Sequence, residues 1–162
     1  MGKKTLIGIS LFALLAGLFF NVAPGMLEKS MNKVSVQDET NTSADIEQFH
    51  KSLLIGDLHA DSLLWNRDLL SRSDRGHVDL PRLQAGNVAL QMFTTVTKSP
   101  RGQNVHANSA DAPDNITSLV MAQRWPIATW SDLSERALYQ AGKLQGFVDA
   151  SAGELMWVRS QL

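Results

Sequence analysis

Runs of apolar residues divide this chain into an N-terminal hydrophobic segment, two short apolar stretches and several amphipathic stretches separated by polar turns. The N-terminal segment, residues 5–22, contains no charged side chain. It is as long as the shortest helices that cross a membrane, roughly 17–18 residues, and longer than the usual apolar core of a signal peptide. We therefore expect residues 1–23 to form a membrane anchor.

Two alternatives to a retained anchor are a cleaved signal peptide and a buried core helix. Ala23 offers the best cleavage position, but Pro24 follows it directly and Asn21 stands where a small residue is preferred. A core helix at the extreme terminus would be unusually apolar. The anchor is favoured, and secretion after cleavage is its alternative.

The lysines that flank the anchor bear on its orientation. Lys3 and Lys4 favour a cytoplasmic N-terminus, although Lys29 and Lys33 on the other side weaken that preference. The remainder of the chain would then lie outside the cytoplasm, in the periplasm of a bacterium. Residues 24–46 are largely polar and show no sustained period, which predicts a tether.

Two short apolar stretches, residues 53–57 and 88–95, predict buried strands. A helix is expected between them because leucines recur there at helical spacing, at Leu63, Leu64, Leu69 and Leu70. Strand, helix and strand in this order predict a parallel βαβ unit. A third short strand is expected at residues 155–158, followed by a helix that Ser160 would cap.

Capping residues predict the remaining helices. Four residues are placed to cap helices: Asp45 for residues 46–53, Asp79 for 80–85, Asp114 for 115–125 and Ser131 for 132–148. Gly86 would end the helix over residues 80–85. The last helix has one apolar face, made of Leu133, Ala137, Ala141, Leu144 and Val148. The rings of Trp125 and Trp130 are expected to pack this helix against the preceding one.

These elements place the chain in the α/β class. With two or three strands, it has too few to close a sheet, and we expect it to be the N-terminal part of a larger domain. An isolated fragment of this kind would leave open strand edges and an uncovered apolar face, so it should fold poorly.

Composition excludes several kinds of chemistry. The formal net charge is −1, so no excess of basic charge favours nucleic acid as a partner. The chain contains no cysteine. Disulfides, thiolate zinc sites, a cysteine nucleophile and a lipid-modified cysteine are therefore all excluded.

The candidate chemistry lies at the end of the first predicted strand. His59 and Asp61 are two residues apart, and in extended backbone such residues point to the same side. Imidazole nitrogen and carboxylate oxygen together suit zinc, manganese or iron. The alternative is structural: His59 would hydrogen-bond a loop and Asp61 would cap a helix. For His77 and Asp79, a second pair with this spacing, the structural interpretation is favoured.

Residues 55–61 (IGDLHAD), followed by residues 76–93 (GHVDLPRLQAGNVALQMF), resemble the membrane dipeptidase family of zinc peptidases. The resemblance covers residues 47–162, about the first third of such an enzyme. It implies a (β/α)₈ barrel in which His59 and Asp61 bind one of two Zn²⁺ ions. The bridging glutamate and two further histidines of the family have no counterpart in this sequence, and Glu154 is not assigned the bridge.

The resemblance implies a membrane-anchored dipeptidase that hydrolyses dipeptides through a metal-activated water, present here as an N-terminal fragment that is inactive by itself. One alternative is another metal-dependent amidohydrolase of the same barrel type. The other is a non-catalytic, membrane-tethered domain. The expected partners are a dipeptide and the membrane, with a homodimer left open and no nucleic acid; no general acid or base can be named.

Overall fold

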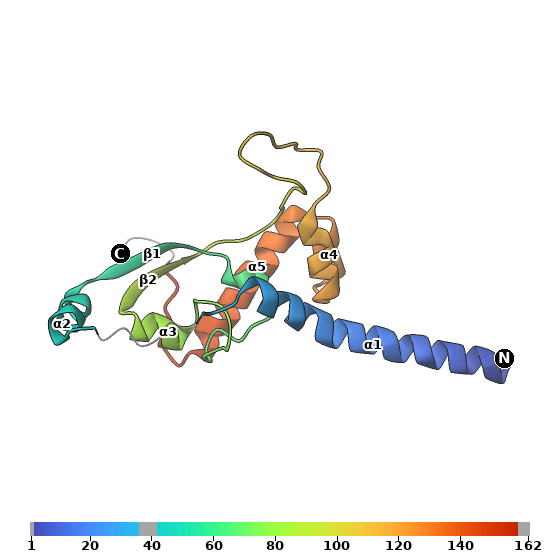
Figure 1. The fold of residues 1–162 in the computed structure, drawn as a ribbon, viewed down its shortest axis with the longest axis horizontal. Helices are drawn as coiled ribbons and strands as arrows, with labels where there is room; N and C mark the ends of the chain where they lie inside the picture. Colours follow the sequence, from blue (N-terminus) through green and yellow to red (C-terminus); the bar gives the residue numbers. More distant parts are fainter. Residues whose placement is uncertain (1, 36–41, 159–162) are drawn as a thin grey trace.

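The computed structural model describes residues 2–35 and 42–158 (Figure 1). In chain order its elements are α1 (Lys3–Met31), α2 (Ala44–Ser52), β1 (Ile55–Ala60), η1 (Ser62–Leu64, a 3₁₀ helix), α3 (Leu80–Ala85), β2 (Val88–Phe93), α4 (Asn115–Ala122), η2 (Ile127–Trp130, a 3₁₀ helix) and α5 (Leu133–Ala150). In Figure 1, α1 extends away from the other elements, which we call the domain, and α2 lies at the domain's opposite end.

Helix α1 is longer than the apolar segment that predicts it. It runs through Pro24 to Met31, and it is long and apolar enough to cross a membrane, a property that a signal sequence shares. The prediction of a tether is therefore wrong for residues 24–31. The expected tether also includes residues 36–41, which lie outside the described residues. Since proline cannot donate a helical hydrogen bond, contacts elsewhere must support the last turns of α1.

Ion pairs supply that support by docking the end of α1 on the domain. The Glu28 carboxylate is buried, with Oε1 3.1 Å from Arg67 Nε and Oε2 3.2 Å from Arg75 Nη2. The backbone N–H of Gly76 donates to the Asn32 carbonyl at 2.7 Å. A carboxylate is buried only where cations compensate for its lost hydration, so this cluster holds α1 in one position.

Replacing Gly76 with alanine is expected to destabilise this docking site by at least about 2 kcal/mol, because an L residue with positive φ costs about 1–2 kcal/mol and steric overlap adds to it. Gly76 has a φ of +74°, and an added Cβ would lie 1.5 Å from Arg67 Nη1. Thermal unfolding followed by circular dichroism measures the loss. Gly142→Ala in α5 is the control, since its Cβ would meet nothing within 4 Å. An equal loss in both variants would contradict the prediction.

The parallel strand pair and the short helix between the strands are confirmed. β1 and β2 form a two-stranded parallel sheet, with Asp57 opposite Gln91. Helix α3 has the expected bounds, and the Asp79 carboxylate accepts from the Arg82 N–H at 3.0 Å as its N-cap. Because a cap and its helix are neighbours in the sequence, such local features can be predicted without knowing the fold.

The helix expected from the leucine spacing before α3 is wrong, because only η1 forms there. Side chains from later in the chain bond this backbone instead. Lys143 Nζ donates to the carbonyls of Leu63 and Trp65, and Gln123 Nε2 donates to the Leu64 carbonyl at 3.0 Å. Burial lowers the pKa of Lys143 to about 8. Since these carbonyls already accept hydrogen bonds, the segment does not need helical ones.

Tryptophan rings join α4 to α5, as expected. Trp125 is fully buried, and its ring centroid lies 4.6 Å from that of Tyr139 in α5. Trp130 packs against the same cluster. The core of this cluster combines residues that follow β1 with residues of α4 and of the turn after it, namely Leu64, Trp65, Ile116, Val120 and Trp125. The apolar residues that follow β1 therefore pack in this core without forming a helix of their own.

The buried face of α5 is polar, contrary to the prediction. Arg136 and Gln140 are fully buried, whereas Leu133 is exposed and the other expected apolar residues are half-buried. The N-cap is Asp132, one residue after the expected Ser131, and it accepts from the Ser134 N–H at 2.8 Å. Arg136 makes five hydrogen bonds, which compensate for its burial.

Helix α2 begins at Ala44, with Ser43 instead of Asp45 as its N-cap residue.

Two further predictions about strands fail. Residues 155–158 form no strand, and Ser160 lies outside the described residues. The expected burial of β1 and β2 is also wrong, since Leu58, Leu90 and Met92 are exposed. Within the described chain, the sheet has two strands, and no element covers these side chains. A strand's apolar pattern indicates which side chains can be buried, but a neighbouring element must be present to bury them.

Candidate functional site

His59 and Asp61 lie together at the carboxyl end of β1. His59 is the penultimate strand residue, and Asp61 directly follows the strand. His59 Nε2 is 3.4 Å from Asp61 Oδ1, and the side chains are 70% and 49% exposed. The expectation that these two side chains point together is confirmed. Their exposure leaves the pair accessible to an ion or a small molecule.

An irregularity in β1 contributes to this arrangement. Asp57 pairs with Gln91 and Ala60 with Phe93, so β1 has one more residue than β2 between the two pairings. A bulge of this kind interrupts the alternation of side chains and redirects the residues beside it. The simple rule that residues two apart share a face therefore does not by itself explain the geometry of His59.

A side chain of β1 and the side chain that follows β2 hold the backbone and the carboxylate of the pair. Asp57 Oδ1 accepts from the His59 N–H at 3.1 Å, and Thr94 Oγ1 donates to Asp61 Oδ1. The His59 N–H and the Gln91 side chain keep the pKa of Asp57 below its usual value. Sequence reasoning missed Thr94 and Gln91; their position within the second predicted strand, residues 88–95, is the signal that could have found them.

The geometry of the pair fits one edge of a metal site. Two ligand atoms, each about 2.1 Å from a tetrahedral ion, are about 3.4 Å apart, and His59 Nε2 and Asp61 Oδ1 have this separation. Because a carboxylate oxygen has two lone pairs, Asp61 Oδ1 can accept from Thr94 and still bind a cation. A protein zinc site needs three or four ligands. Among residues 2–35 and 42–158, no group of three or more suitable side chains comes together.

The other histidines and acidic residues singled out from the sequence lie elsewhere. Asp79 is buried, caps α3 and pairs with Arg82, so its structural interpretation is confirmed. His77 is exposed in the turn before α3, and His106 is exposed in the loop after β2. Glu154 accepts from Gln84 Nε2 at 3.3 Å. The structure does not bring these residues into a cluster with His59 and Asp61.

A cavity of about 500 Å³ lies beside β2, between α3, α5 and residues 154–158. Its lining is mainly apolar and includes Leu83, Leu144 and Val148, and Glu154 is its one ionisable side chain. Apolar walls without converging polar groups can bind or pack an apolar surface, but they supply no catalytic group. This cavity is therefore not the candidate site.

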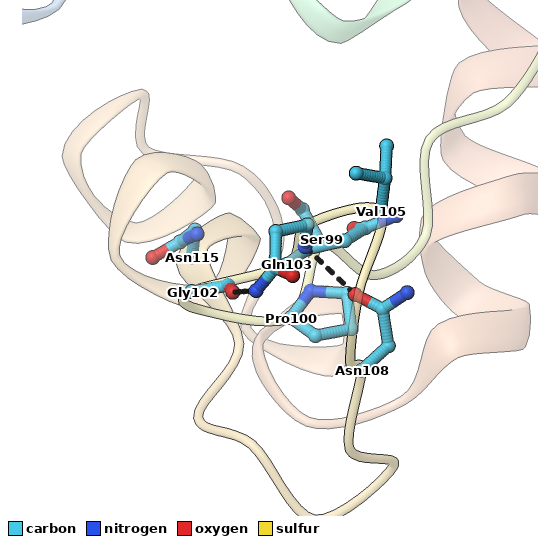
Figure 2. A pocket seen from close by; sticks show the side chains of 8 residues that line it. Ser99, Pro100, Gly102, Gln103, Val105, Asn108 and Asn115 are labelled. Atoms are coloured by element: carbon cyan, nitrogen blue, oxygen red, sulfur yellow. Dashed lines mark hydrogen bonds between the residues drawn. The ribbon is translucent and has the colours of Figure 1, made fainter.

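The loop after β2 forms a separate, open hollow of about 690 Å³ (Figure 2). It is lined by Ser99, Pro100, Gly102, Gln103, Asn104, Val105, Asn108 and Asn115. The Asn104 backbone N–H donates to Asn108 Oδ1 at 2.9 Å across the loop. Asn104 Nδ2 donates to the Gly102 carbonyl at the same distance. Figure 2 shows amide and backbone groups around the hollow. No lining residue is ionisable, so the hollow offers hydrogen bonds but no acid, base or metal ligand.

No protein-family model, curated protein or solved structure matches this chain. The functional interpretation therefore depends on the site itself and on the motif that resembles the dipeptidases.

Proposed function

We propose that this chain is the N-terminal part of a membrane-anchored, zinc-dependent dipeptidase and is inactive by itself. Residues 47–162 would begin a (β/α)₈ barrel, and His59 and Asp61 would bind one of two zinc ions. The observation that carries the proposal is the 3.4 Å separation of His59 Nε2 and Asp61 Oδ1 at the carboxyl end of a parallel strand. Barrel enzymes place their reactive groups at that end of the strands.

The two-stranded sheet supports a larger fold around this pair. Parallel strands are ordinarily covered on both faces, yet Leu58, Leu90 and Met92 are exposed. Further strands and helices of a barrel would cover such side chains and bring additional ligands to the same edge. The long apolar helix α1 supports the anchor. Lys3 and Lys4 favour a cytoplasmic N-terminus, which would place the domain outside the cytoplasm.

The residues of this chain would bind and orient the metal. His59 would offer the Nε2 lone pair of a neutral imidazole, and Asp61 would add a negative charge. The Thr94 hydroxyl, by donating to Asp61 Oδ1, would fix the rotation of that carboxylate, as partners of metal ligands commonly do. A bound zinc ion lowers the pKa of a coordinated water and polarises the substrate carbonyl.

Substitution of either ligand is expected to lower metal binding and hydrolysis together. In the complete gene product, His59→Ala and Asp61→Ala should each reduce kcat/KM for a Gly-x dipeptide by more than about 100-fold, while Thr94→Val, which removes only an orienting partner, should cost about 10-fold. Zinc content by elemental analysis and hydrolysis with and without chelator are the two measurements. His106→Ala is the matched control, because His106 is exposed in a loop.

Each alternative function has its own outcome in this experiment. Chelator-sensitive hydrolysis of another amide, an ester or a lactone, without dipeptide hydrolysis, would replace the dipeptidase with a different amidohydrolase. If the product binds no zinc, the remaining interpretation is a non-catalytic, membrane-tethered domain. The docking of α1 through Glu28 is also consistent with that interpretation. Full activity in the His59→Ala and Asp61→Ala variants would contradict the proposed site.

A further inference from the structure

Helix α1 contacts the domain at two levels. Glu28 is buried between Arg67 and Arg75, and two turns earlier Asn21 Oδ1 accepts from Arg124 Nη2 at 3.3 Å. The two contacts are about 10 Å apart along the helix axis, at 1.5 Å per residue. Two attachment points along one axis determine the direction of the helix relative to the domain, and not only its position.

The contact between Asn21 and Arg124 lies where the apolar segment ends. Residues 5–22 carry no charge, so Asn21 belongs to the last turn of the segment that would occupy the membrane. Glu28 follows Val22 by about 9 Å of helix. The headgroup layer on one side of a bilayer is about 5–8 Å thick. With α1 in a membrane, Glu28 would reach the aqueous edge of this layer, and the side chain of Arg124 would lie within it.

The surface around Arg124 has the composition of a membrane-contacting surface. Arg124 is exposed, as are Met121, Pro126 and Ile127, with Ile127 76% exposed. We call these four residues the α4–η2 face. Figure 1 shows α4 beside α1, and the hydrogen bond from Arg124 to Asn21 places this face next to the helix. Apolar side chains next to an arginine suit the boundary between acyl chains and anionic headgroups.

We propose that the α4–η2 face rests in the headgroup layer of the same bilayer that α1 spans. The docked helix then holds the domain in one orientation on the membrane, unlike a domain on a flexible tether. The occupant of this face is lipid, because the face continues the surface of the membrane-spanning helix at the depth where that helix leaves the bilayer. This inference depends on the proposed membrane anchor.

Because the chain has no cysteine, single-cysteine variants carrying an environment-sensitive fluorophore can measure the depth of chosen sites. The variants are Ile127→Cys on the face, Leu14→Cys within α1 and Leu54→Cys as the control. Leu54 is 89% exposed and follows α2, at the end of the domain away from α1 (Figure 1). Each is reconstituted in vesicles of phosphatidylcholine and phosphatidylserine with spin-labelled lipid as quencher.

We expect quenching at positions 14 and 127 to exceed that at position 54 by at least about twofold, as for side chains inserted at the bilayer surface. Quenching at position 14 without quenching at 127 would overturn the inference and leave the anchor intact. Absence of quenching at position 14 would overturn the proposed anchor, and the inference with it. Equal quenching at 54 and 127 would indicate unoriented adsorption and would also overturn the inference.

A second comparison tests whether the docked helix causes the orientation. In the Ile127→Cys variant, Glu28→Gln should lower quenching at position 127 to the level of position 54. In the Leu14→Cys variant, the same substitution should leave quenching at position 14 unchanged. Lys29→Gln is the matched control, because Lys29 pairs with Asp74 at 3.2 Å in an exposed ion pair. Retained quenching at 127 in the Glu28→Gln variant would contradict a role for the docked helix.

Discussion

Replacing Arg136 with methionine is expected to destabilise the domain by about 3–5 kcal/mol, the usual cost of removing one partner from a buried ion pair. Arg136 is 1% exposed. Its five N–H groups donate to the carbonyls of Thr97, Thr129 and Trp130, to the Thr117 hydroxyl and to Asp114 Oδ2. Methionine fills a similar space but donates nothing, so each of these acceptors loses its hydrogen bond from Arg136.

Thermal or urea unfolding of the detergent-solubilised chain, followed by the near-ultraviolet circular dichroism of the tryptophans, measures this loss. Arg72→Met is the matched control, because Arg72 is exposed, and it should change stability by less than about 0.5 kcal/mol. Arg136→Lys should fall between the two, since lysine keeps the charge but has three donors on one atom. Similar stabilities for the Arg136→Met and Arg72→Met variants would show that the network contributes little.

The same network makes stability depend on acid pH. Burial alone would raise the pKa of Asp114, but hydrogen bonds from the Ser99 N–H, Arg136 and the Ile116 N–H hold it well below the ordinary value of 3.8. A lowered folded-state pKa adds stability that is complete above the unfolded-state pKa and is lost as the pH falls below it. Stability should therefore fall below about pH 4, and less steeply in Asp114→Asn.

The second large effect is expected at Glu28. Glu28→Gln removes the negative charge between Arg67 and Arg75 and should weaken the docking of α1 by about 3 kcal/mol, since the buried Arg67 loses its carboxylate partner. Arg75 is partly exposed and keeps its ion pair with Asp74. Local opening at the docked segment would then become roughly 100-fold more frequent. Hydrogen exchange of the Gly76 N–H, which donates to the Asn32 carbonyl, reports this opening directly.

Lys29→Gln is the control for this exchange measurement. It removes an ion pair whose partners are largely exposed, and such pairs contribute about 0–1 kcal/mol. Exchange at Gly76 should therefore increase by less than about fivefold in that variant. Unchanged exchange at Gly76 in Glu28→Gln would show that packing, and not the ion pairs, holds the end of α1.

The features that could be predicted from the sequence depend on interactions between close neighbours. Asp79 and Asp114 cap helices that begin one residue later, and a strand followed by a helix and a strand predicts a parallel pair. The apolar segment within α1 and the proximity of His59 and Asp61 belong to the same group. A capping side chain or an apolar run acts within a few residues, so the local sequence contains the information needed.

The predictions that failed concern features that depend on partners distant in the sequence. Arg136 meets Asp114 across 22 residues, and Lys143 meets the Leu63 carbonyl across 80. These contacts replaced an expected apolar face on α5 and an expected helix after β1. The position of Thr94 against Asp61 and the bulge in β1 likewise depend on the pairing of two strands. The periodicity of a sequence shows which side chains of one element share a face. It cannot identify which groups of other elements the fold brings opposite that face.

By itself, then, the sequence determined the apolar helix, the two strands, most helix positions and the pair of candidate ligands. The tertiary structure decided the rest: where α1 ends, how it docks through Glu28, and how a buried arginine joins four segments. The physical reason is the cost of burying polar groups. A buried charge or carbonyl must find a partner, and only the folded chain determines which distant residue supplies it.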